Sequence, residues 1–397
     1  GLYGIRVSSA TTTDIVPIVV RPTTKHRAVT VLIPTFTYLA YANEQLYDDL
    51  NHALFSSEPL EMNDLDRYRM ETPDVGLSQY DRHWDTSGVM FSTARRPILN
   101  MRHDQLMWLS GSARHLAAEM FLIEWLIDQG FEFDVITDME LHEMGPAALG
   151  DSRVLITGSH PEYHTVETMR ALTNFRDAGG RIMYLGANGF YWVTGVVCAS
   201  PLVTEVRRGV AGSRSWESYS GEDTLQSTGE PGGLWRHRGM APNTVAGIGI
   251  VAQGWGKSEP YWRSPASYSD AYSWVFDGVD EEPIGAYGFV MGGAAGDEID
   301  RFEPALGSPV NTVVLASSRD HTRFYQRVHE ELAFTLPGNG GDEDPEVRAD
   351  IVMVETPGGG RVFSVGSIAY SGALLVNGGD NGISRLTRNV LQRFLSE

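Results

Sequence analysis

The sequence has little cysteine and little lysine. Only one of its 397 residues is a cysteine, Cys198, and lysine occurs only as Lys25 and Lys257. A single cysteine excludes an internal disulfide framework and any zinc cluster built from cysteines. It fits a cytoplasmic setting, which is the localisation we expect.

Positive charge and long apolar runs are also scarce. The chain has 31 Lys and Arg against 51 Asp and Glu, a formal net charge of −20 at pH 7. Such a balance repels phosphate backbones and anionic lipid, so we expect no nucleic-acid or membrane partner. The absence of a run of about 18 apolar residues and of a charged-then-apolar leader predicts a soluble protein. Because Gly-Leu-Tyr opens the chain without an initiator Met, we expect a processed product or part of something longer.

The order of apolar runs and helical patterns predicts an α/β protein. Residues 1–25 are polar and are expected to form an arm or linker, and residues 26–200 and 306–397 alternate strand-like with helix-like segments. That alternation predicts an open, mostly parallel sheet with flanking helices. Between them, residues 201–305 lose helical periodicity, and we expect an inserted lobe rich in strands and loops. The predicted strands are 28–33, 131–136, 154–157, 181–185, 312–316, 351–354 and 362–365, and the predicted helices are 113–129, 165–178, 322–334 and 384–395, the last with Ser384 as its N-cap.

Several polar side chains follow directly after predicted strands. Ligands in open α/β sheets sit beyond the carboxyl ends of the strands, so these side chains are expected to converge. The alternative is that they are ordinary polar loop residues. In chain order they are Tyr41, His160, Glu162, Asn188, Ser367 and Tyr370.

The densest motif follows the predicted strand 154–157. His160, Glu162 and His164 occur at spacing two, and in an extended segment that spacing points them the same way. These three residues therefore predict a zinc site, unless His164 only begins the next helix.

Nucleophilic catalysis fits the sequence less well. Ser159 lies where a nucleophile elbow would be, but Pro161 departs from the Gly-x-Ser-x-Gly pattern. Cys198 lacks a glycine-flanked turn and is expected to pack as a small hydrophobe.

Four ordered motifs resemble the C-terminal catalytic half of the N,N-dimethylformamidase large subunit. The resemblance implies a glutamine-amidotransferase-like, flavodoxin-like α/β fold without its cysteine nucleophile. It also implies an amidohydrolase that converts N,N-dimethylformamide, or a similar small formamide, to dimethylamine and formate, together with a small helical subunit as partner in a larger oligomer. The motifs are Pro34-Thr-Phe-Thr-Tyr-Leu-Ala-Tyr-Ala-Asn43, Tyr80-Asp-Arg-His-x-Asp-x-Ser-Gly-Val89, Thr157-Gly-Ser-His-Pro-Glu-Tyr-His-Thr165 and Gly180-Arg-Ile-Met-Tyr-Leu-Gly-Ala-Asn-Gly-Phe-Tyr-Trp192.

The same resemblance implies a mononuclear iron, Fe³⁺, held by two tyrosinates and one glutamate with a histidine close by. By motif, the glutamate is Glu162, the histidine is His160 and one tyrosine is Tyr80. The other tyrosine is Tyr41 in preference to Tyr38, because Ala-Tyr-x-Asn is the shared part of the motif.

That donor set suits a hydrolytic metal. Two phenolates and one carboxylate sum to three negative charges, which neutralise iron(III), whereas soft thiolates suit it badly. Iron(III) polarises a carbonyl and lowers the pKa of water. We expect His160 to act as general base on the activated water and then as acid to the leaving amine.

Other residues have two interpretations each. Asn188 either hydrogen-bonds the water or amide oxygen or satisfies its own turn, and Glu298 either reaches the site or lies in a solvated loop. Phe190, Trp192 and Phe334 either wall a small apolar pocket or belong to the core. The rival functions are a zinc hydrolase that uses the two histidines and glutamate of the spacing-two motif, and a non-catalytic scaffold with a degenerate amidotransferase-like fold.

Overall fold

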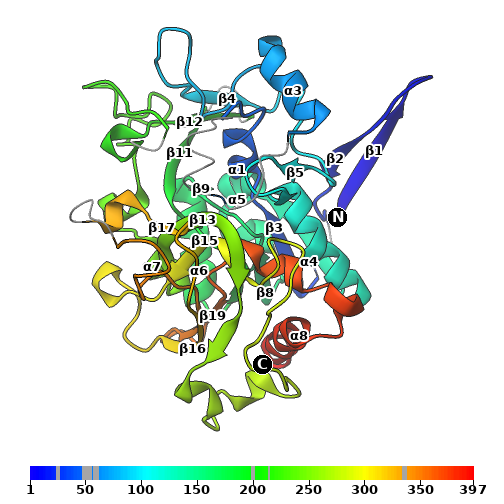
Figure 1. Cartoon of the computed structure of the whole chain (residues 1–397), viewed down its shortest axis with the longest axis vertical. Coiled ribbons are helices and arrows are strands. Elements are labelled where there is room, and N and C mark those ends of the chain that lie inside the picture. Colours follow the sequence, from blue (N-terminus) through cyan, green and yellow to red (C-terminus); the bar gives the residue numbers. More distant parts are fainter. Residues whose placement is uncertain (24–26, 47–55, 57–61, 198–201, 213–214, 333–337) are drawn as a thin grey trace.

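An eight-stranded mixed sheet organises the computed structural model, which describes residues 1–23, 27–46, 56, 62–197, 202–212, 215–332 and 338–397 (Figure 1). The strand order is β14-β16-β18-β19-β10-β8-β3-β7. Neighbours from β19 to β7 pair in parallel, and neighbours from β14 to β19 pair antiparallel. The α/β class is therefore confirmed, and the parallel arrangement holds for one half of the sheet. The strands are β14 (Tyr261–Arg263), β16 (Val313–Ser318), β18 (Asp350–Glu355), β19 (Arg361–Ser364), β10 (Arg181–Tyr184), β8 (Val154–Thr157), β3 (Val29–Ile33) and β7 (Phe133–Thr137).

Helices cover both faces of this sheet, because successive side chains of its strands point to opposite faces. Val31 of β3 belongs to the apolar cluster formed with α4 and α8, and its neighbour Leu32 belongs to the cluster formed with α5 and α6. Both residues are fully buried, so the sheet is the middle of three layers. The helices are α4 (Leu116–Asp128), α8 (Gly382–Ser396), α5 (Asp138–Met144) and α6 (Val166–Asp177).

Smaller sheets and helices surround the main sheet. The predicted arm forms an antiparallel hairpin of β1 (Leu2–Ser8) and β2 (Thr13–Val19) that projects from the body (Figure 1). Strand β14, from the segment predicted as an inserted lobe, is an edge strand of the main sheet, and the lobe boundaries stay a prediction. The other elements are α1 (Thr35–Ala40), α3 (Asp64–Glu71), α7 (Pro242–Ala246), the sheet β4-β12-β11-β9 (Phe91–Thr93, Val203–Val206, Trp192–Val196, Tyr163–His164), the sheet β15-β13-β17 (Ala295–Arg301, Gly249–Glu259, Gln326–Arg327) and the pair β5 (Leu106–Met107) and β6 (Ser112–Ala113).

Two sequence predictions about helices are wrong. The predicted helix 322–334 contains the strand β17 and a 3₁₀ turn at His329–Glu331, and residues 333–337 lie outside the described part. Here pairing of β17 with β13 and full burial of Tyr325 outweigh helical propensity. The N-cap of α8 is Asn381, not Ser384, because the Asn381 side chain accepts a hydrogen bond from the Ser384 N–H.

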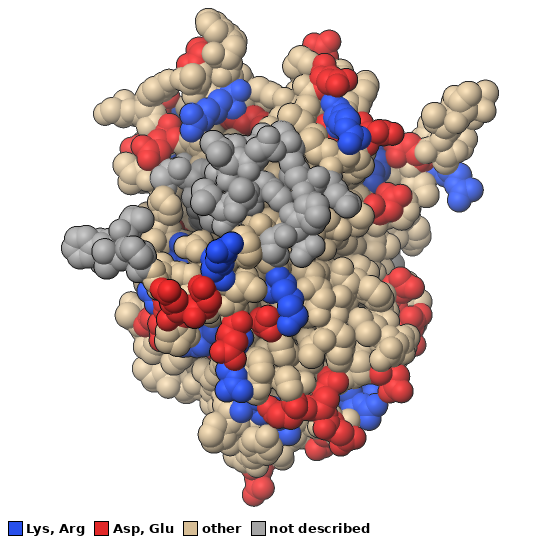
Figure 2. Space-filling view, viewed as in Figure 1, with Lys and Arg blue, Asp and Glu red and all other residues tan. Residues whose placement is uncertain are grey.

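Two observations concern membrane spans and surface charge. No described helix combines the length and the apolar character needed to cross a bilayer. In the face shown in Figure 2, Lys and Arg side chains stand singly or in small groups among Asp and Glu.

The buried carboxylate of Asp138 links α5 to α1, and its protonation makes the stability of the fold depend on pH. Its carboxylate accepts a hydrogen bond from the Phe36 N–H at 3.1 Å, and burial raises its pKa from 3.8 to about 8. Since the folded-state pKa is the higher one, stability is lost as pH rises from about 4 through 8. We expect Asp138→Asn to reduce this loss by about 1–3 kcal/mol between pH 5 and pH 8. Urea unfolding of both proteins at the two pH values measures it, and equal losses would contradict the assignment.

Candidate active site

The candidate site lies where three adjacent strands of the main sheet, β10, β8 and β3, end. Tyr41 directly follows α1 after β3, His160 follows β8, and Asn188 follows β10, so the predicted convergence holds for these three. The two residues after β19 are engaged elsewhere. Ser367 bonds the backbone of Gly296 at 2.9 Å, and Tyr370 bonds Thr387 at 2.8 Å.

Three oxygen-bearing side chains meet at the centre of the site, and we call Tyr41, Tyr80 and Glu162 the oxygen cluster. The Tyr41 hydroxyl lies 2.7 Å from the Tyr80 hydroxyl and 2.9 Å from Glu162 Oε2. The Tyr80 hydroxyl lies 3.1 Å from Oε1 and 3.2 Å from Oε2 of the same carboxylate. Two phenol hydroxyls and one carboxylate from separate parts of the chain thus lie within hydrogen-bond distance of one another.

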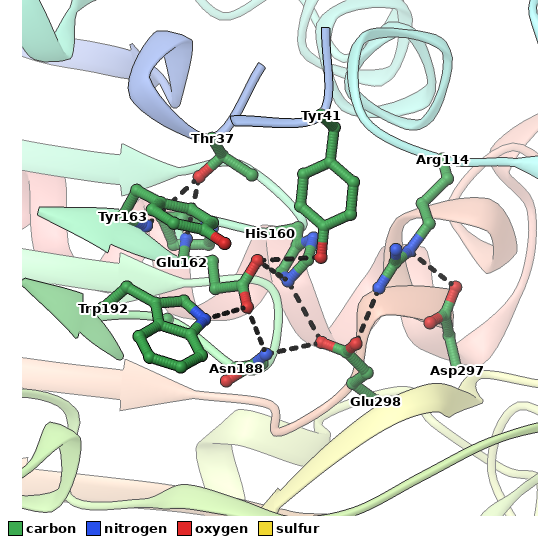
Figure 3. Close-up of polar contacts among 12 residues, drawn as sticks. Thr37, Tyr41, Arg114, His160, Glu162, Tyr163, Asn188, Trp192, Asp297 and Glu298 are labelled. Atoms are coloured by element: carbon green, nitrogen blue, oxygen red, sulfur yellow. Dashed lines mark hydrogen bonds and ion pairs between the residues drawn. The ribbon is translucent and has the colours of Figure 1, made fainter. Parts of the chain in front are cut away.

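Two further side chains donate hydrogen bonds to the Glu162 carboxylate (Figure 3). The sequence analysis had given both of them other roles. Asn188 Nδ2 and Trp192 Nε1 donate to Glu162 Oε1 at 3.2 and 3.1 Å. The backbone N–H of Glu162 donates to Thr37 Oγ1 at 3.0 Å. Trp192 therefore orients the carboxylate and is not only an apolar wall.

A buried charge network borders the oxygen cluster. Nε2 of His160 lies 3.0 Å from Glu298 Oε2 and 3.4 Å from Glu162 Oε2. The other oxygen of Glu298 pairs with Arg114 Nη2 at 2.9 Å, and Arg114 also pairs with Asp297 at 3.2 Å. Glu298 is 4% exposed, so it lies in the site and not in a solvated loop. Its strand, β15, brings it from outside the main sheet.

Burial controls the protonation of the oxygen cluster. Desolvation raises the pKa of Tyr41 and of Tyr80 well above the usual tyrosine value, and the charge of Glu162 raises both further. Desolvation also raises the pKa of Glu162, against the charge of His160. Three negative charges at this point would need a compensating cation.

His164 lies outside this group. Its two ring nitrogens bond Thr168 Oγ1 and the Pro161 carbonyl, both at 3.0 Å, and burial lowers its pKa to about 3. Its ring packs 4.9 Å from that of Phe190, which therefore belongs to the core around His164. Within the described ranges, no three His, Cys, Asp or Glu side chains form a group that could hold a metal ion. The geometry therefore does not support the predicted zinc trio that included His164.

The two neighbouring tyrosines at α1 differ in their contacts, and which of them is a metal ligand stays a prediction. The Tyr38 hydroxyl is buried without a hydrogen-bond partner among the residues that the structure describes, and the Tyr41 hydroxyl contacts Glu162. Cys198 and Phe334 lie outside the described residues, so their predicted roles stay predictions.

Sequence reasoning missed Arg208 and Tyr163. The Arg208 guanidinium lies 4.2 Å from the ring centre of Tyr80 and 4.5 Å from that of Trp192, and it donates to the Tyr163 hydroxyl at 2.9 Å. The Tyr163 hydroxyl in turn lies 2.8 Å from the Tyr80 hydroxyl. Tyr163 is next to Glu162 in the 157–165 motif, which was a usable signal, but no motif marks Arg208.

The chain is thus a mixed α/β protein with a buried oxygen-rich site at the carboxyl edge of its sheet. It belongs to the family described as N,N-dimethylformamidase beta subunit-like, C-terminal. The model of that family matches residues 1–382. The N,N-dimethylformamidase beta subunits of Paracoccus aminophilus and of an Alcaligenes species are each 39% identical to it over 401 residues. These matches cover 100% of this chain and 52% of each relative, so the chain spans about half the length of the curated relatives it matches.

One solved structure has a low similarity to this chain. A ThuA-like protein from Bacteroides uniformis is similar over 71% of this chain and 84% of its own, with a TM-score of 0.37 and 11% identity.

The ion pairs of Arg114 give a direct test of the network. Replacing Arg114 with Met leaves Asp297 and Glu298 buried without their cation, and we expect the free energy of unfolding to fall by about 3–5 kcal/mol. Arg67→Met is the matched control, since its side chain is 56% exposed and its partner Asp64 is in solvent. Denaturant unfolding that shows equal effects for the two variants would contradict the network.

Proposed function

We propose that this chain carries the catalytic site of an amidohydrolase that hydrolyses N,N-dimethylformamide, or a similar small formamide. Water adds to the carbonyl carbon, the carbon–nitrogen bond breaks, and formate and dimethylamine leave. The observation that carries the proposal is the oxygen cluster beside His160, in a chain whose relatives are named N,N-dimethylformamidase beta subunits.

A single iron ion is the cofactor that we propose for the oxygen cluster. Phenolate and carboxylate oxygens are hard donors, which suit a hard cation better than a soft one. Tyr41 and Glu162 are buried and Tyr80 is partly buried, and the three side chains supply three ionisable oxygens whose total charge on deprotonation matches iron(III). When bound, the ion supplies Lewis acidity to the carbonyl and to the attacking water.

His160 is the proton carrier in this proposal. Its Nε2 faces the oxygen cluster, where it takes a proton from the attacking water and returns one to the departing amine nitrogen. Glu298, 3.0 Å from the same nitrogen, stabilises the imidazolium between these two transfers. Arg114 holds Glu298 in the charged form that this requires.

Asn188 positions the two carboxylates. Its Nδ2 donates to Glu162 at 3.2 Å and to Glu298 at 2.7 Å, so its amide hydrogens are already used. Its Oδ1 is buried without a partner in the described part of the chain and can accept a hydrogen bond from the attacking water. Asn188 thus acts on the water through its oxygen and on the carboxylates through its nitrogen.

Wider features of the family enter the same proposal. We infer that the parallel half of the main sheet is an amidotransferase-like core and that the protein is cytoplasmic. We also infer a small helical subunit as partner, because a protein named a beta subunit implies a second kind of chain.

Removal of a single oxygen donor tests the metal site. We expect Tyr41→Phe, Tyr80→Phe and Glu162→Gln each to lower bound iron at least about tenfold and to weaken the visible tyrosinate absorption. Tyr38→Phe is the matched control, since its hydroxyl has no partner and does not contact Glu162. Elemental analysis with an optical spectrum measures both effects. Colourless protein with stoichiometric zinc would favour the zinc hydrolase, and protein without stoichiometric metal would favour the scaffold.

The role of His160 has its own test. We expect His160→Gln to retain iron and to lower kcat for N,N-dimethylformamide by about 10²–10⁴. His103→Gln, at a largely exposed position, is the control and should keep the parent rate. Steady-state kinetics on iron-matched samples measures the difference, and full turnover by the His160 variant would remove the proton-carrier role.

A further inference from the structure

His115 is a buried histidine that the proposed reaction does not yet use. The residue is 5% exposed, and both of its ring nitrogens lack a hydrogen-bond partner among the described residues. A buried polar group without a partner is costly and rare, so it points to a ligand or an ordered water.

The ring of His115 borders the oxygen cluster. Its centroid lies 4.4 Å from that of Tyr41 and 5.6 Å from that of His160, on which it stacks at 20°. The residue is held at φ 53 and ψ −129 at the start of α4. Positive φ is costly for a residue with a side chain, and such residues gather at functional sites.

A small cavity reaches this ring. It has a volume of about 10 Å³, which is at the lower limit for one water. Its lining includes Arg114 and His115, both at most 5% exposed, and Leu106, which is 50% exposed. His115 therefore borders both this cavity and the oxygen cluster.

Several other donors around the oxygen cluster are already committed, while Arg208 Nε and His160 Nδ1, like the nitrogens of His115, lack a hydrogen-bond partner among the described residues. Asn188 Nδ2 and Trp192 Nε1 donate to carboxylates, and the Arg114 guanidinium faces two acids. The unpartnered Tyr38 hydroxyl has Glu119 and Asp138 as its charged neighbours, not the residues of the cluster. An imidazole ring always carries at least one N–H, so His115 keeps a free donor.

A tertiary formamide fits a free donor of this kind. Its nitrogen carries no hydrogen and it offers the carbonyl oxygen as its acceptor. We propose that His115 is a substrate-binding residue whose ring N–H donates to the amide oxygen, so that the site selects small carbonyl compounds by this hydrogen bond. The proposal rests on the proposed amidohydrolase function and adds a binding residue to it.

The test compares an oxygen acceptor with a sulfur acceptor in the full chain. We expect His115→Phe to bind iron as the parent does and to raise KM for N,N-dimethylformamide about tenfold. N,N-dimethylthioformamide as competitive inhibitor presents a weak sulfur acceptor, so its Ki should change less than about twofold. Tyr38→Phe, which removes a neighbouring buried donor, should leave both constants unchanged.

A second variant protects the test from a folding failure. His115→Gly suits the positive φ, and we expect the same rise in KM and the same nearly constant Ki. An unchanged KM in either folded variant would overturn the proposal, as would a thioamide Ki that rises by the same factor as KM. If the parent chain does not hydrolyse N,N-dimethylformamide at all, the proposed function fails first, and this inference fails with it.

Discussion

The rest of the site depends on the buried carboxylate of Glu162. It contacts the hydroxyls of Tyr41 and Tyr80, and it accepts from Asn188 and Trp192. A carboxylate in a dry interior is unfavourable unless donors or a cation surround it. The donors here come from three separate stretches of the chain, so the fold has to bring all of them to one point. That requirement explains why the carboxyl edge of the main sheet, and not a surface groove, holds the chemistry.

Strands from three sheets, or the loops that follow them, position the side chains of the site. The main sheet supplies Tyr41, His160 and Asn188 through the loops after β3, β8 and β10, and β11 of the four-stranded sheet begins with Trp192. Strand β15 of the third sheet brings Asp297 and Glu298, where Arg114 neutralises them. Asn188 and Asp297 have φ of 47 and 68, and packing from several sheets maintains such backbone conformations. Rigid placement of this kind suits a site in which acids and phenols must approach within hydrogen-bond distance.

Features that depend on residues close together in the sequence were predicted correctly. Seven of the eight strands of the main sheet, all but β14, and the helices α4, α6 and α8, but not α5, follow from apolar runs and periodicity. His160 and Asn188 were found because each lies just beyond a strand, and Tyr41 because it follows the first strand of the sheet along the chain. Contacts between distant segments left no such signal. Arg208 reaches Tyr80 across more than a hundred positions without a motif, and the pairing of β17 with β13 overrode a helical pattern. His164 shared the spacing of His160, but its bond to the Pro161 carbonyl turns it away from the cluster.

The central claim is that the phenols of the oxygen cluster hold iron as phenolates. Resonance Raman spectroscopy of the iron-loaded chain, excited within the visible band, tests it most directly, because only ring modes of ligating tyrosinate gain intensity there. The account predicts enhanced tyrosinate modes that shift when the tyrosines carry ring deuterium and that weaken in both Tyr41→Phe and Tyr80→Phe. Iron-loaded, active protein without enhanced tyrosinate modes would contradict the account.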